Sequence, residues 1–205
     1  MLHRKQVLVW ICIGMLLGWI VLPLVQYWPV LEDEEFEAAK AWAVSVWFDK
    51  IEQVEDYPFG VIRRADAVQW YLRVMDQLEK QPLRETCSFT DIKGLNQSLQ
   101  DDIIRSCTLN VFLWDGGAFN PDRYMTKATA LVALMRSLRP EIEHPMQELY
   151  RTPYVTDAYT LWITKRPSNE YLEYPITRYE LLLLLYRGYE ECRGKSAECR
   201  NDGIQ

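Results

Sequence analysis

The first 30 residues carry a long apolar stretch. Residues 7–25 are almost wholly apolar, and positions 6–30 hold no charged residue. A helix of that length spans the hydrocarbon core of a bilayer, whereas a helix of a soluble domain rarely goes so far without a polar face. The pattern therefore predicts a transmembrane helix within residues 1–30.

Two features decide between a cleaved signal peptide and a retained anchor. Bulky residues follow the apolar stretch, where a cleavage site needs small ones, and Tyr27 and Trp28 suit a membrane interface. Arg4 and Lys5 precede it, which places the N-terminus in the cytoplasm by the positive-inside rule. We expect an uncleaved signal-anchor with the rest of the chain outside the cytoplasm; a cleaved signal peptide is the alternative.

A first pair of amphipathic helices is expected after residue 30. Apolar residues recur at helical spacing over 36–51, behind an acidic cluster at 32–37 that suits a helix start. A turn at 55–60 precedes a second helix over about 64–78. The apolar side of that helix consists of Ala67, Trp70, Tyr71 and Val74.

A second pair is expected between residues 89 and 138. In chain order it contains Phe-Thr-Asp at 89–91, a short helix with Ile103 and Ile104, a turn at 115–117 and Phe-Asn-Pro-Asp at 119–122. Thr126 is a good cap for the second helix. Asn110 suits a left-handed turn, because Asn tolerates that backbone better than most residues.

A third pair is expected towards the C-terminus. A helix over about 155–163 is followed by a loop at 166–169 and by Pro-Ile-Thr-Arg-Tyr-Glu at 175–180. Thr177 and Glu180 have the spacing of a capping box, in which each side chain satisfies a backbone N–H at the helix start. Residues 181–185 are apolar on every side, so this helix should be central and buried.

The order of these features resembles the S-layer homology (SLH) repeat. That family's pattern is roughly F-x-D, a helix, G-[IV]-[IV]-x-G, G-x-F-x-P, then I-T-R-A-E and a closing helix. Copies of the I-T-R-A-E motif, with their basic residue at Arg64, Lys127 and Arg178, recur along the chain. Self-similar units that repeat at intervals of this size indicate a repeat architecture. The resemblance implies an all-α fold of three degenerate SLH-like repeats in a pseudo-threefold bundle. The repeats would cover about 35–80, 87–139 and 145–190, with a tail at 191–205.

The same resemblance implies a ligand. Grooves between neighbouring SLH repeats hold an acidic, often pyruvylated, secondary cell-wall polysaccharide. Its carboxylates would pair with the motif cation, because a helix N-terminus beside a guanidinium attracts anions. The residues carried over are Arg64, Lys127 and Arg178, with Asp91 and Gly117 as groove-shaping candidates. The alternative is that these cations pair with neighbouring carboxylates, and that Asp91 caps a helix.

The copies depart from the family pattern in ways that bear on binding. Arg63 stands where the family has a threonine cap, and Thr129 stands where it has Glu. Lys127 replaces Arg and loses the forked geometry of a guanidinium. Trp114 and Tyr179 are candidates to stack on sugar rings, or else they belong to the core.

Composition and charge exclude several functions. Hydrophobic residues make up 49% of the 205 residues, which suits a packed core. All 29 acidic residues and 21 of the 23 basic ones follow residue 30, so that part has a net charge of −8 and is unsuited to general nucleic-acid binding. Of the two histidines, His3 is expected on the cytoplasmic side, so His144 stands alone in the part after residue 30, and no Gly-rich phosphate loop occurs. We expect no enzymatic activity, cofactor or metal.

Four cysteines follow the apolar segment, an even number that fits disulfides in an exported domain. Of the three connectivities, Cys87–Cys107 with Cys192–Cys199 is favoured, and free thiols in packed sites are the alternative. Cys87 and Cys107 lie too far apart in sequence to resemble half of a zinc site.

These patterns favour a non-catalytic cell-envelope protein that is anchored in the membrane and binds a cell-wall polysaccharide through SLH-like grooves. The alternative is an extracytoplasmic scaffold that binds an envelope or S-layer protein instead of a glycan. The altered motifs of the first two copies favour the scaffold, because lost Thr, Arg and Glu residues would weaken glycan binding.

Overall fold

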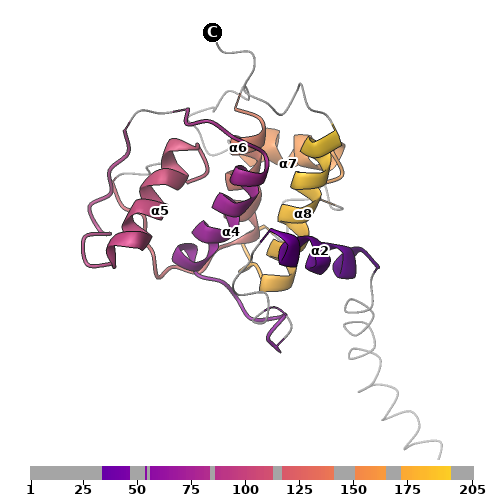
Figure 1. Cartoon of the computed structure of the whole chain (residues 1–205), viewed down its shortest axis with the longest axis horizontal. Helices are drawn as coiled ribbons and strands as arrows, with labels where there is room; N and C mark the ends of the chain where they lie inside the picture. The colour runs from indigo at the N-terminus through magenta and orange to yellow at the C-terminus, as the bar shows by residue number, and fades with distance from the viewer. Residues whose placement is uncertain are drawn as a thin grey trace, which may run out of the picture. The chain divides into compact units, whose positions relative to one another are not determined.

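A computed structural model describes residues 34–46, 54, 56–83, 86–112, 117–140, 151–164 and 172–194. Regular structure in these residues is helical apart from isolated bridges, which confirms the all-α class. The helices are α2 (Glu34–Ser45), α4 (Arg64–Gln77), α5 (Gln97–Thr108), α6 (Lys127–Leu138), α7 (Arg151–Thr160) and α8 (Arg178–Gly194) (Figure 1). The chain divides into two compact units, 1–38 and 39–205, and the packing below belongs to the second.

Both ends of the chain lie outside the described residues. The predicted membrane segment at 1–30 is among them, and none of the helices that the structure does describe is long and apolar enough to cross a membrane. Helix α8 continues to Gly194, past the predicted start of a tail at residue 191. Cys192 is disulfide-bonded, and its predicted partner Cys199 lies outside the described part.

Helices α6 and α8 supply much of the core. Residues 181–185 of α8 are all buried, which confirms the expected central helix, and residues 130–135 of α6 are buried as well. Gly188 allows a close approach, since a Cβ at this position would lie 2.8 Å from Cδ2 of Leu134. Helix α6 contacts α7 and α8, and α4 contacts α5 and α8.

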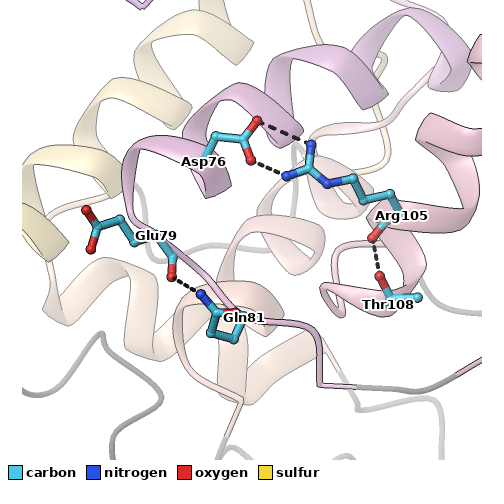
Figure 2. Close-up of polar contacts among 5 residues, drawn as sticks. All are labelled: Asp76, Glu79, Gln81, Arg105 and Thr108. Atoms are coloured by element: carbon cyan, nitrogen blue, oxygen red, sulfur yellow. Dashed lines mark hydrogen bonds and ion pairs between the residues drawn. The ribbon is translucent and has the colours of Figure 1, made fainter.

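The predicted apolar side of α4 faces the core. Ala67, Trp70, Tyr71 and Val74 are all buried. The Tyr71 hydroxyl donates a hydrogen bond to the carbonyl oxygen of Ala130 at 2.7 Å, which joins α4 to α6. On its outer side, Asp76 accepts two hydrogen bonds from the Arg105 guanidinium of α5 (Figure 2). Both of these side chains are about half exposed, so their ion pair adds little stability.

Helix α5 is fixed at both ends. The Asn96 side chain caps its start by accepting a backbone N–H of the first turn at 2.8 Å. A disulfide joins Cys107, in the last turn, to Cys87, as the sequence predicts. Asn110 follows the helix at φ 62, which confirms its left-handed conformation, and its Nδ2 donates to the carbonyl oxygen of Arg136 at 3.2 Å.

Two helices differ from the limits that the sequence predicts. Helix α2 ends at Ser45, short of the predicted residue 51, and residues 47–53 lie outside the described part. Helix α7 begins and ends earlier than the predicted 155–163. The reason at its end is Trp162, whose φ of 59 turns the chain so that the N–H of Ile163 donates back to Ala158 at 2.9 Å.

Three short segments meet ahead of α4, α6 and α8. The N–H of Ile176 donates to the carbonyl oxygen of Met125 at 2.8 Å. The N–H of Met125 donates to Ile62 at 2.9 Å, and that of Ile62 donates to Ile176 at 3.4 Å. The three bonds close a cycle, and all three side chains are buried. The cycle gathers three helix starts at one end of the helices, because each residue lies two positions ahead of a helix.

Candidate functional site

The three predicted cations share one structural position. Arg64, Lys127 and Arg178 are the first residues of α4, α6 and α8. Each is neither fully buried nor fully exposed. The motif alignment predicts this correspondence, but the surroundings of the three side chains differ.

The backbone amides at these helix starts are already hydrogen-bonded. In α8 the N–H of Arg178 donates to Gly60 at 2.9 Å, and that of Tyr179 donates to Pro58 at 3.0 Å. The equivalent amides of α4 and α6 donate to carbonyl oxygens within 121–123 and 172–174. The first two amides of each of these helices are therefore already bonded within the fold, so they lend no support to the expectation that the helix N-terminus supplies part of an anion site. Side chains must supply the positive charge.

Arg64 lies over aromatic rings. Its guanidinium carbon is 5.2 Å from the ring centroid of Phe112 and 4.9 Å from that of Phe119. The two rings meet edge to face at 5.7 Å. A cation over the negative faces of such rings is attracted electrostatically. The contacts hold the Arg64 side chain against the segment that leads into α6.

Asp91 and Gly117 order the loop ahead of α6. The two carboxylate oxygens of Asp91 accept the N–H groups of Phe119 and Asn120 at 2.7 and 2.6 Å. The Gly117 carbonyl oxygen accepts the N–H and the hydroxyl of Thr90 at 2.7 and 2.8 Å. Gly117 has φ 95, a conformation that favours glycine. Asp91 thus binds loop amides and does not cap a helix.

The surroundings of Asp91 favour its ionised form. Burial raises the pKa of the Asp91 carboxyl. The hydrogen bonds from the N–H groups of Phe119 and Asn120, together with the charge of Arg64, lower this pKa by more than burial raises it. The pKa of Asp91 therefore lies below its ordinary value. Arg64 therefore acts on a carboxylate within the fold. Of the predicted site residues, the structure brings Arg64 and Asp91 together in this region.

Lys127 forms an internal ion pair. Its Nζ lies 2.5 Å from Oε1 of Glu180, which belongs to α8. The other oxygen of Glu180 accepts the N–H of Thr177 at 3.0 Å, and the Thr177 hydroxyl accepts the N–H of Glu180 at 3.2 Å. The predicted capping box is therefore confirmed. The predicted Thr126 cap is also confirmed, since its hydroxyl accepts the N–H of Thr129 at 3.1 Å.

Arg178 lies against Gly60. A Cβ at Gly60 would overlap Nη1 of Arg178 and would lie 3.3 Å from Cζ, so a glycine leaves the room that the guanidinium occupies. Within the described residues, the Arg178 side chain has no hydrogen bond or ion pair. Of the three motif cations, Arg178 has its charge uncompensated by a carboxylate in the described part of the chain.

The aromatic candidates have different outcomes. Tyr179 is 5% exposed and belongs to the core, and Trp114 lies outside the described residues. Exposed rings occur instead in the segments ahead of the motif helices: Tyr57, Phe59, Tyr124 and Tyr174. The exposure of Tyr124 could have been inferred from its position next to the apolar Met125. Neighbouring side chains in an extended segment point to opposite sides, so a buried Met125 leaves Tyr124 on the outside.

Comparisons of the chain with protein-family models, with curated proteins and with solved structures found no match. Function is therefore inferred from the contacts above and from the motifs in the sequence.

Proposed function

We propose that this chain is a non-catalytic, membrane-anchored protein of the cell envelope that binds an acidic cell-wall polysaccharide through three degenerate SLH-like repeats. The cycle of hydrogen bonds through Ile62, Met125 and Ile176 supports the proposal. Three copies around a pseudo-threefold axis would make equivalent contacts in turn, as these segments do. The N-terminal apolar segment anchors the chain, and the repeats lie outside the cytoplasm.

The observation that carries the proposal is the environment of Arg178. A guanidinium binds a carboxylate through two parallel hydrogen bonds, and Arg178 has no carboxylate partner among the described residues. Lys127 is already paired with Glu180, and Arg64 is held over two rings near the ionised Asp91. We therefore assign recognition of the polysaccharide carboxylate mainly to Arg178.

The proposal is tested by sedimentation of the full-length chain, kept in detergent, with purified cell walls of the source organism. Binding is expected to walls that retain their polysaccharide and not to walls from which it has been removed chemically. Arg178→Ala should weaken binding by roughly ten-fold or more, the worth of a hydrogen bond to a charged group. Arg193→Ala is the control, since it removes the same charge from an exposed site of the same helix. Equal binding by all three chains would refute the assignment.

A second pair of variants tests the position of the guanidinium without removing its charge. Gly60→Ala adds a methyl group where Arg178 Nη1 lies, whereas Gly94→Ala adds one where no atom lies within 4 Å. Neither glycine has a left-handed φ, so the backbone tolerates Ala at both. Gly60→Ala should therefore weaken polysaccharide binding, and Gly94→Ala should leave it unchanged.

Two observations favour a scaffold that binds an envelope or S-layer protein. Lys127 is paired with Glu180 and is therefore not available to a glycan carboxylate. The chain also has exposed aromatic rings, a residue type that is enriched in protein interfaces. Cross-linking of the full-length chain in isolated envelopes distinguishes the two functions. A specific protein partner, together with no affinity for the polysaccharide, would favour the scaffold.

A further inference from the structure

The start of α5 contains an acceptor motif for N-linked glycosylation. Asn96 is followed by Gln97 and Ser98, which matches the pattern Asn-x-Ser with a residue other than proline in the middle. Among the asparagines of the chain, only Asn96 has Ser or Thr two positions later. A motif of three residues is short enough to arise by chance. The surroundings of its side chains therefore decide whether it can accept a sugar.

Both side chains that the motif requires are accessible. Asn96, Gln97 and Ser98 are all exposed. Within the described residues, neither the Nδ2 group of Asn96 nor the hydroxyl of Ser98 has a hydrogen bond. The hydroxyls of Ser106 and Thr108, in the same helix, instead donate to carbonyl oxygens three positions earlier. Ser98 is the second residue of α5, so no helical turn precedes it to accept such a bond.

The side-chain oxygen of Asn96 has a separate role. It accepts the N–H of Leu99 at 2.8 Å and so caps α5. N-glycosylation replaces one hydrogen of the Nδ2 group and leaves the amide oxygen as a hydrogen-bond acceptor. The modified side chain therefore keeps the cap, and the fold loses no helix contact when a glycan is attached.

The region around Asn96 has room for a bulky group. A Cβ at Gly94, two positions earlier, would have no heavy atom within 4 Å. Helix α5 packs on α4, and Figure 1 shows α5 on the side of α4 that is away from α8. A glycan on Asn96 would therefore lie apart from Arg178 at the start of α8.

We propose that Asn96 is an N-glycosylation site, and that the sugar donor is an oligosaccharide carried on a polyprenyl diphosphate. A membrane oligosaccharyltransferase would join Nδ2 of Asn96 to the anomeric carbon of the first sugar. The bond from that carbon to the diphosphate oxygen breaks, and its electron pair leaves with the lipid diphosphate, which takes up the displaced Nδ2 proton. This reaction takes place outside the cytoplasm. The inference therefore rests on that part of the proposed function and is independent of polysaccharide binding.

The test is mass spectrometry of the full-length chain purified from membranes of the source organism. Trypsin cleaves after Lys93 and Arg105 and releases residues 94–105, in which Asn96 is the one asparagine. We expect this peptide to carry the added mass of an oligosaccharide on Asn96. The peptide that contains Asn120, an exposed asparagine outside any acceptor motif, should carry none.

Three variants made in the source organism separate the motif from the cap. Ser98→Ala keeps Asn96 and its cap and should lose the added mass completely. Ser98→Thr should retain it, because Thr also completes the motif. Asn96→Asp keeps an oxygen that caps the helix but lacks Nδ2, so it should lose the mass and still fold. An unmodified wild-type peptide, or an added mass that survives Ser98→Ala, would overturn the proposal.

A labelling experiment distinguishes failure of this inference from failure of the proposed location. Lys93 is exposed and lies close to the motif. A membrane-impermeant amine reagent reaches it in intact cells when this part of the chain is outside the cytoplasm. Labelled Lys93 beside unmodified Asn96 would refute the glycosylation site and leave the proposed location standing. Unlabelled Lys93 beside unmodified Asn96 would refute both, whereas an oligosaccharide on Asn96 supports both.

Discussion

Lys127 of α6 and Glu180 of α8 meet through an ion pair of 2.5 Å between Nζ and Oε1. Glu180 has two roles, because its second carboxylate oxygen accepts the backbone N–H of Thr177 in the capping box of α8. The two side chains are 32% and 36% exposed, so solvent screens their attraction. The pair links two core helices at the end where the motif cations lie.

Glu180→Gln should release Lys127 and keep the capping box, because Gln also serves at this position of the motif. We expect a loss of about 0.5–1 kcal/mol in the free energy of unfolding, the size of a partly exposed ion pair. We also expect tighter polysaccharide binding, since Lys127 becomes available to a carboxylate. A double-mutant cycle with Lys127→Met measures the coupling, and additive effects of the two changes would contradict the pairing.

Asp91 should give the domain a specific acid sensitivity. Its pKa lies below the ordinary 3.8, so its contribution to stability is fully present above that value and is lost as the pH falls through the lower folded pKa. Asp91→Asn should therefore destabilise the protein at neutral pH and lose this effect in strong acid. Urea unfolding of wild type and variant from about pH 2 to pH 7, roughly the range in which Asp91 passes from protonated to ionised, measures the difference between their free energies of unfolding. Asp101→Asn is the control, because that exposed carboxylate accepts a side-chain N–H of Gln97 and no loop amide is known to depend on it.

The Tyr71 hydroxyl should contribute modestly to the contact between α4 and α6. Tyr71 is fully buried, and burial raises its pKa well above 10.0 despite the nearby charge of Arg64, so the hydroxyl stays protonated and donates to Ala130. Tyr71→Phe should cost about 1 kcal/mol, the net worth of one hydrogen bond. Tyr71→Ala should cost about 3–5 kcal/mol, because it also leaves a cavity. Denaturant unfolding distinguishes these values, and equal losses would contradict the packing described.

The Cys87–Cys107 disulfide should account for a large share of the stability of the middle segment. It closes a loop with a sequence separation of 20 residues, and the cross-link should contribute about 3 kcal/mol by limiting the unfolded chain. The Cys87→Ala/Cys107→Ala double variant should unfold at a lower temperature than wild type under oxidising conditions. Under reducing conditions the two proteins should converge. A gap that persists after reduction would mean that packing of the cysteines, and not the bond, is responsible.

Local patterns in the sequence determined the helices and their ends where the determining contacts are short-range. The apolar side of α4 follows from apolar residues that recur three or four positions apart. The Thr126 cap, the Thr177–Glu180 capping box and the left-handed Asn110 follow from residues at most three positions apart. The correspondence of Arg64, Lys127 and Arg178 also follows from the motif alone. The Cys87–Cys107 pair also follows from the local sequence, since the two cysteines lie near the two ends of one short helix.

The tertiary structure decided what each of these cations contacts. Glu180 pairs with Lys127, which lies 53 positions earlier in the sequence. Gly60 leaves room for the guanidinium of Arg178, which lies more than a hundred positions later in the sequence. The first two amides of α4, α6 and α8 donate hydrogen bonds to carbonyl oxygens of other segments. No local pattern in the sequence reveals these long-range bonds. Such contacts depend on how three separate segments close into one cycle. The sequence therefore determined where the charges stand along the chain, whereas long-range packing determined which of them pair with a carboxylate among the described residues and which do not.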